Sequence, residues 1–218
     1  MDSITRTKKS QKVTIVGAIV DFLLSIFKVI IGVIGNSGAL IADGVHSFSD
    51  LLTDWVTWYA AKQAGEAPDQ EHPYGHERFE TVATLGLSIF LAIIGTAIIF
   101  DAMGRLTNAG ALNHESWLIA AAGLSIASKE ALYWYTVTVA KNINSEMLKA
   151  NAWHHRSDAF SSVVVIIGIV GAVNGYYYLD SAAAIIVGIM IIYIGWKLGF
   201  EATKELVDTS IDDEDIKK

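Results

Sequence analysis

Long apolar blocks constrain the fold of this 218-residue chain more than any other feature of its sequence. Several of them approach the length of about 20 residues that a helix needs to cross a lipid bilayer. Apolar residues make up 52% of the chain and charged residues only 18%, whereas soluble domains carry roughly a quarter charged residues. The composition therefore predicts a membrane protein, and the formal net charge of -7 argues against a nucleic-acid partner.

Six membrane-spanning helices are predicted from these blocks, which makes the fold class an all-α polytopic membrane protein. Three domains are expected: a cytoplasmic N-terminal segment at 1–12, a six-helix transmembrane transport domain at 13–206 and an acidic cytoplasmic tail at 207–218. Ser145 is the expected N-cap of the fifth span. The predicted spans are 13–35, 39–63, 79–104, 115–140, 147–173 and 181–203.

The placement of lysine and arginine predicts how the chain is oriented, because these residues accumulate on the cytoplasmic side of a membrane. With six spans, the lysines and arginines of the loops and span ends fall on one side, and the other side holds only Arg105. Both termini are therefore expected in the cytoplasm. The first apolar run is too long for a cleaved signal peptide, so it is expected to stay as a span. The expected location is the cell membrane, as a multi-pass protein of a prokaryotic inner membrane.

Two of the predicted spans each carry a histidine and an aspartate four residues apart. His46 is followed by Asp50, and His154 is followed by Asp158. Side chains at this spacing lie on one face of a helix, about 6 Å apart along its axis. An aspartate near the centre of a bilayer costs about 2.5–3.5 kcal/mol on insertion scales. These groups must therefore face each other, water or a cation.

Two imidazoles and two carboxylates form a ligand set that suits tetrahedral Zn²⁺. The chain has no cysteine, so a thiolate site for copper(I) or an iron–sulfur cluster is excluded. The set has too few oxygens for Ca²⁺ or Mg²⁺, while Cd²⁺, Fe²⁺, Co²⁺ and Mn²⁺ stay open. Hydrogen bonds between helices, or a proton relay without metal, are the alternative. Two pairs on two separate spans favour the metal.

The residues around these pairs resemble the cation diffusion facilitator family. The segment Ser37-Gly-Ala-Leu-Ile-Ala-Asp-Gly-Val-His-Ser-Phe-Ser-Asp50 is similar to the signature of that family. The segment His154-x-x-x-Asp158 is similar to the motif on its fifth helix. The resemblance covers residues from about 10 to 215. It implies a homodimeric metal/proton antiporter whose transport site is formed by the two His–Asp pairs.

Two departures from the family pattern are visible. Many bacterial members carry aspartate where His46 stands, and the histidine version resembles members that prefer zinc. The family usually continues into a small cytoplasmic α+β domain that binds metal, and this chain ends at Lys218, where that domain would begin. Either a naturally short member or a truncated one is therefore expected.

The polar loop after the second span is expected to hold a second metal site. Asp69, His72 and His76 resemble the loop-borne site of the family and could bind Zn²⁺ together with a water molecule. The alternative is a solvated loop without metal. Arg78 and Asp208 resemble the charge pair of the family, which would tie the third helix to the sixth at the dimer interface.

The other polar side chains within the spans have less specific expected roles. Asp43 is expected either to attract cations at the outer mouth or to hydrogen-bond a helix end. Asp54 is expected to line the inner vestibule, and His155 to be a hydrogen-bonding or cavity residue rather than a ligand. The remaining charged residues are expected in structural pairs or lining a vestibule: Asp21, Lys28, Lys129 and Glu130.

The predicted function is secondary active export of divalent metal cations, Zn²⁺ first among them, in exchange for protons by alternating access. Metal binding needs neutral imidazoles and ionised carboxylates, so it expels protons, and imidazole titrates near pH 6.5 in water. The expected partners are metal ions, protons, lipid and a second copy of the chain.

Two other functions stay open. One is a metal-binding sensor or partner subunit that does not transport. The other is a membrane metallohydrolase, which would need an open coordination position and a general base. Four strong ligands leave no such position, and the sequence has no His-Glu-x-x-His motif. The chain is therefore not expected to be an enzyme.

Overall fold

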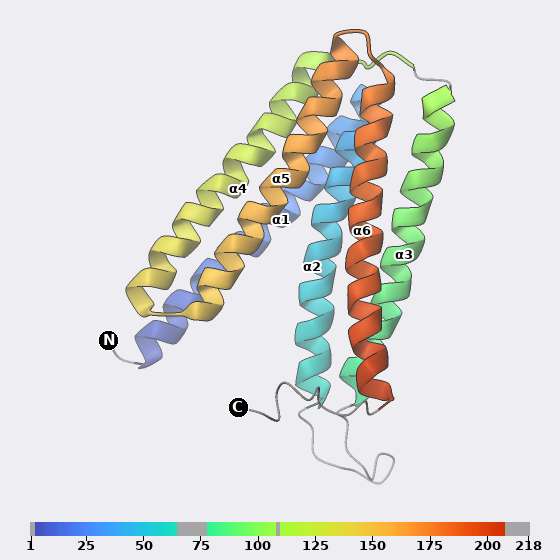
Figure 1. Cartoon of the computed structure of the whole chain (residues 1–218). Coiled ribbons are helices and arrows are strands. Elements are labelled where there is room, and N and C mark those ends of the chain that lie inside the picture. The colour runs from blue at the N-terminus through green and yellow to red at the C-terminus, as the bar shows by residue number, and fades with distance from the viewer. Residues whose placement is uncertain (1–2, 65–77, 108–109, 208–218) are drawn as a thin grey trace, which may run out of the picture. The chain divides into compact units, whose positions relative to one another are not determined.

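The computed structural model describes residues 3–64, 78–107 and 110–207, which form six α-helices and no strand (Figure 1). The all-α fold class is thereby confirmed. The helices agree with the expected spans within a few residues, except that α1 begins ten residues earlier, because the polar segment before residue 13 continues the helix. The bounds are α1 Ser3–Gly35, α2 Gly38–Ala64, α3 Arg78–Thr107, α4 Glu115–Ile143, α5 Glu146–Val173 and α6 Tyr178–Leu206.

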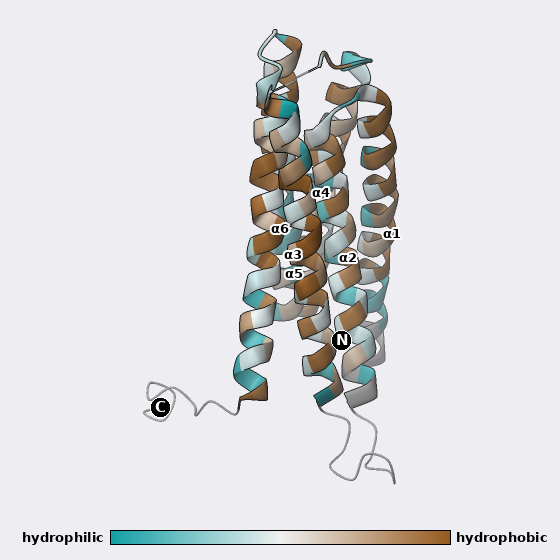
Figure 2. Cartoon of the chain, turned by 90° about the vertical axis from the view of Figure 1, so that its right-hand side faces the viewer, coloured by the Kyte–Doolittle hydropathy of each residue, from teal (hydrophilic) through white to brown (hydrophobic). Residues whose placement is uncertain are grey.

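Four of these helices are long and apolar enough to cross a membrane by length and composition, namely α1 from Lys8 onward, α3, α5 and α6. Helices α2 and α4 have similar lengths of 27 and 29 residues, but their polar residues lower their hydropathy. Large apolar side chains such as Ile19 and Leu23 are exposed, while Lys28 and Lys129 are buried. Figure 2 shows that hydrophobic residues make up much of α1 and α6. This inverted distribution is typical of a protein in lipid.

The chain divides into two compact units. The first comprises 1–51 and 97–189, and thus contains α1, α4 and α5 with the beginnings of α2 and α6 and the end of α3. Within it, α4 packs along α5, and α1 packs against α4. The second comprises 52–96 and 190–218. There, α3 and α6 approach closely, since a Cβ atom added at Gly195 would lie 2.9 Å from the Ser88 carbonyl oxygen.

A short turn joins α4 to α5 and sets where α5 begins. Asn144 ends α4 in the left-handed region with φ 50°, a conformation that asparagine tolerates better than most residues. The Ser145 hydroxyl oxygen then accepts a hydrogen bond of 3.3 Å from the Leu148 backbone N–H. The expected N-cap of α5 is therefore confirmed.

The N-terminus of α2 is capped by a side chain from α6. The buried Asp180 carboxylate accepts hydrogen bonds from the backbone N–H groups of Gly38 at 2.7 Å and Ala39 at 3.3 Å, and from the Ser37 hydroxyl. The first N–H groups of a helix have no partner within the helix, and a negative charge there is favourable. Asp180 therefore fixes the first turn of α2, two turns before His46.

Helices α1 and α2 are joined by a fully buried ion pair. The Lys28 ammonium donates to an Asp43 carboxylate oxygen at 3.0 Å, to the Asp43 carbonyl at 3.1 Å and to the Ser47 hydroxyl at 2.6 Å. Asp43 also accepts from the hydroxyls of Ser161 and Ser162 on α5, at 3.0 and 2.9 Å. All three N–H groups of the ammonium thus have acceptors, which is what a charge at this depth requires.

Candidate metal site

Helices α2 and α5 bring together three of the four side chains that were expected to form the metal site within the membrane. His46 and Asp50 come from α2, Asp158 comes from α5, and one ligand atom of each lies within 4.8 Å of the others. All three belong to the first compact unit. His46 and Asp158 are buried and Asp50 is nearly so, with 15% of its side chain exposed. One imidazole and two carboxylates thus converge in a water-poor position.

Two atoms of this group are enclosed without a hydrogen-bond partner among the described residues. They are Nδ1 of His46 and one carboxylate oxygen of Asp50. The same Asp50 oxygen lies 3.9 Å from Nε2 of His46, which is too far for a hydrogen bond. Buried polar atoms are nearly always satisfied, and leaving one unpaired costs free energy. A cation among these atoms would satisfy the Asp50 oxygen.

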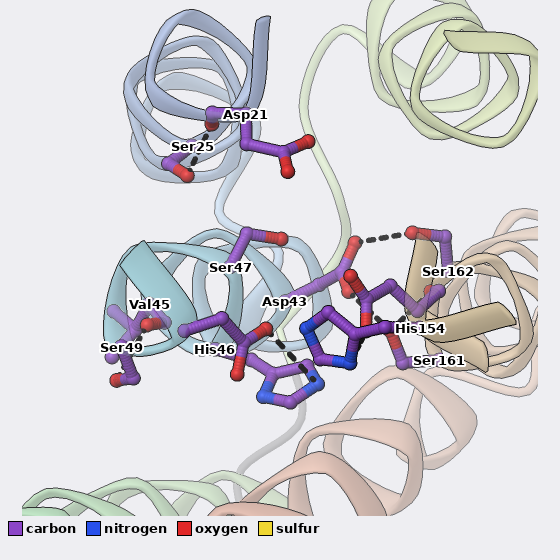
Figure 3. A network of polar contacts seen from close by, with 12 residues as sticks. Asp21, Ser25, Asp43, Val45, His46, Ser47, Ser49, His154, Ser161 and Ser162 are labelled. Carbon is purple, nitrogen blue, oxygen red and sulfur yellow. Dashed lines mark hydrogen bonds and ion pairs between the residues drawn. The ribbon is translucent and has the colours of Figure 1, made fainter. Parts of the chain in front are cut away.

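His154, the fourth expected ligand, lies beside this group. Its Nδ1 atom is 3.8 Å from an oxygen of Asp158, and about half of its side chain (49%) is exposed. Figure 3 shows the rings of His46 and His154 projecting from α2 and α5 toward the same region. His154 thus lies next to the group through Asp158 without being one of its three members.

Sequence reasoning missed a lysine that touches the site. The Lys129 ammonium of α4 lies 2.9 Å from an Asp158 oxygen and 2.8 Å from an oxygen of Asp21 on α1. Nδ1 of His155 lies 3.6 Å from the other Asp21 oxygen. The sequence indicated that Lys129 needs a partner inside the membrane. It could not indicate that the partner belongs to the candidate metal site, because that depends on how α4 packs against α5.

The other expected site residues lie elsewhere. Asp43 is fully buried in the ion pair with Lys28, and Asp54 is exposed on α2 one turn beyond Asp50. Arg78 is the exposed first residue of α3. Four expected residues lie outside the described part of the chain, so the loop site and the charge pair stay predictions: Asp69, His72, His76 and Asp208.

Long apolar helices together with a buried histidine–carboxylate group are typical of membrane proteins that handle cations. The chain belongs to the cation efflux family, because residues 14–207 match its cation efflux transmembrane domain. The resemblance seen in the two His–Asp motifs is thereby confirmed.

Individual relatives span plants, fungi and bacteria. Metal tolerance protein C1 of Arabidopsis thaliana is 36% identical over an alignment that covers 94% of this chain and 46% of the plant protein. Mitochondrial metal transporter 1 of Saccharomyces cerevisiae is 32% identical over 96% of this chain and 46% of its own length. Manganese efflux system protein MneP of Bacillus subtilis is 31% identical over 98% and 74%. The chain thus spans about half the length of several curated relatives that it matches.

Proposed function

We propose that this chain is the transmembrane transport domain of a metal exporter that carries divalent cations out of the cytoplasm in exchange for protons. The observation that carries this proposal is the group formed by His46, Asp50 and Asp158, whose ligand atoms lie within 4.8 Å of one another. His154 is the proposed fourth ligand, since it lies beside Asp158 on α5. The efflux family to which the chain belongs supports transport of a metal cation rather than catalysis.

Zn²⁺ is the proposed cargo, because two imidazole nitrogens and two carboxylate oxygens match its tetrahedral preference. The names of the relatives are compatible with several metals, and one of them is named for manganese efflux. Mn²⁺ prefers oxygen ligands and higher coordination numbers than this set provides. Both metals belong in the same assay for that reason.

Proton exchange and alternating access complete the proposed cycle. Metal binds to the inward-open site when its imidazoles are neutral and its carboxylates ionised. Protons replace the metal when the site faces outward, and their return drives the next export step. The proposed arrangement is a homodimer in the cell membrane with both termini in the cytoplasm.

Metal binding and flux test this proposal together. The chain is purified in detergent for binding and reconstituted in liposomes for uptake, with Zn²⁺ and Mn²⁺ measured in parallel. Asp50→Asn and His46→Gln should each weaken Zn²⁺ binding by at least about tenfold, since even the loss of an outer partner of a metal ligand costs that much. Asp101→Asn and His114→Gln are matched controls, because these residues lie outside the group in an exposed ion pair and at an exposed helix start.

Four outcomes would decide against parts of the proposal. Tight Zn²⁺ binding by both Asp50→Asn and His46→Gln would refute the proposed metal site. Intact binding without flux favours the sensor or partner subunit. Zn²⁺ flux that does not change with an imposed pH gradient would refute the exchange for protons. Mn²⁺ flux well above Zn²⁺ flux would identify Mn²⁺ rather than Zn²⁺ as the cargo.

A further inference from the structure

One carboxylate of the candidate metal site is shared with a positive charge that belongs to the protein. The Lys129 ammonium lies 2.9 Å from an oxygen of Asp158, and that side chain is also a member of the group with His46 and Asp50. Lys129 is 2% exposed, so its charge is not screened by water. A dication at the site would therefore meet a fixed monocation that already contacts one of its ligands.

A second carboxylate also contacts Lys129. Oδ1 of Asp21, on α1, lies 2.8 Å from the ammonium, and Nδ1 of His155 lies 3.6 Å from the other Asp21 oxygen. Asp158 and Asp21 thus compete for one ammonium, and the balance between them decides how much positive charge the metal site feels. Charges only a few ångströms apart inside a protein shift an equilibrium by more than tenfold.

We propose that Lys129 is a tethered competing cation that lowers the affinity of the site for the exported metal, with Asp21 as the anion that draws Lys129 away from Asp158. The inference rests on the proposed function of the site. An empty site keeps Asp158 neutralised by Lys129. An arriving dication must either displace the Lys129 ammonium from the Asp158 carboxylate or bind beside it against the repulsion between the two positive charges. The affinity is thereby held low enough for the metal to leave again.

Two single variants should change metal affinity in opposite directions. Lys129→Gln removes the competing charge, so Zn²⁺ should bind at least about tenfold more tightly. Asp21→Asn removes the anion that offsets Lys129, so Zn²⁺ should bind at least about tenfold more weakly. The double variant Asp21→Asn/Lys129→Gln keeps the total charge of the wild type and should lie between the two. A purely structural role for Lys129 would weaken binding in both single variants.

The experiment is calorimetric titration of the full chain in detergent with Zn²⁺ at pH 8, where protons compete weakly. Lys28→Gln is the matched control, because it removes an equally buried lysine whose carboxylate partner is not a proposed ligand. Its affinity should stay within about threefold of the wild type. Circular dichroism of each variant shows whether it is folded. Should Lys129→Gln fail to fold, the double variant still tests the inference, because it should bind Zn²⁺ more tightly than Asp21→Asn, whereas a purely structural role for Lys129 would not restore the affinity.

The outcomes separate this inference from the proposed function. Unchanged or weaker binding by folded Lys129→Gln, or unchanged or tighter binding by Asp21→Asn, would overturn the role of Lys129. A wild type that binds no Zn²⁺, or an Asp50→Asn variant that binds as well as the wild type, would overturn the site itself.

Discussion

The ion pair between Lys28 and Asp43 gives the sharpest test of how buried charges stabilise this domain. Both side chains are completely enclosed, and the ammonium has three acceptors, two of them on Asp43. Asp43→Asn keeps the size of the side chain and a carbonyl acceptor but removes the negative charge. The ammonium then stays buried without its counterion, which typically costs about 3–5 kcal/mol. The free energy of unfolding should fall by that amount.

An exposed ion pair provides the control for this prediction. Asp101 and Arg105 lie one turn apart on α3, with 62% and 34% of their side chains exposed. Exposed pairs contribute at most about 1 kcal/mol, so Asp101→Asn should be nearly neutral. The double variant Lys28→Met/Asp43→Asn should recover part of the loss, because no uncompensated charge remains.

Equilibrium unfolding measures these differences. The variants are purified in detergent micelles and unfolded with increasing fractions of sodium dodecyl sulfate, and helix content is followed by circular dichroism. A difference of less than about 1 kcal/mol between Asp43→Asn and Asp101→Asn would refute the reasoning.

Three further predictions follow from the helix contacts and the ligand chemistry. Gly44→Ala should be about 1–3 kcal/mol less stable than Gly123→Ala in the same unfolding assay. A Cβ atom at Gly44 would lie 2.7 Å from Val29 Cγ2, whereas none of the described atoms lies within 4 Å of one at Gly123, and the gain in helix propensity is common to both. Asp180→Ala should lower the free energy of unfolding by about 1–2 kcal/mol, because the first turn of α2 loses its cap. Faster amide hydrogen exchange at Gly38 and Ala39 would locate the loss at this turn. Zn²⁺ affinity should fall at least about tenfold between pH 7.5 and 5.5, because protons compete for imidazole and carboxylate ligands, and a pH-independent affinity would contradict these ligands.

Local sequence patterns predicted the helices well, because apolar blocks and turn residues act over short distances. The N-cap at Ser145 lies where it was expected. The spacing of His46 and Asp50 likewise placed both side chains on one face of α2. The early start of α1 was missed, because hydropathy indicates where a span meets the membrane and not where its helix begins.

Contacts between distant helices could not be predicted in the same way. Asp180 caps α2 across more than 140 residues of sequence, and Lys129 reaches Asp158 across 29. In each case the sequence showed a polar residue that needed a partner at its depth, but several helices offered one. Only the packing of α1, α4 and α5, and of α6 against the start of α2, selects which partner is within reach.

The three acceptors of Lys28 have a mechanical consequence. A shift of α1 along α2 by a single residue moves the ammonium by 1.5 Å in a helix of standard rise and turns it through about 100°, so all three hydrogen bonds are lost together. Helices α1 and α2 should therefore move as one rigid body during any conformational change.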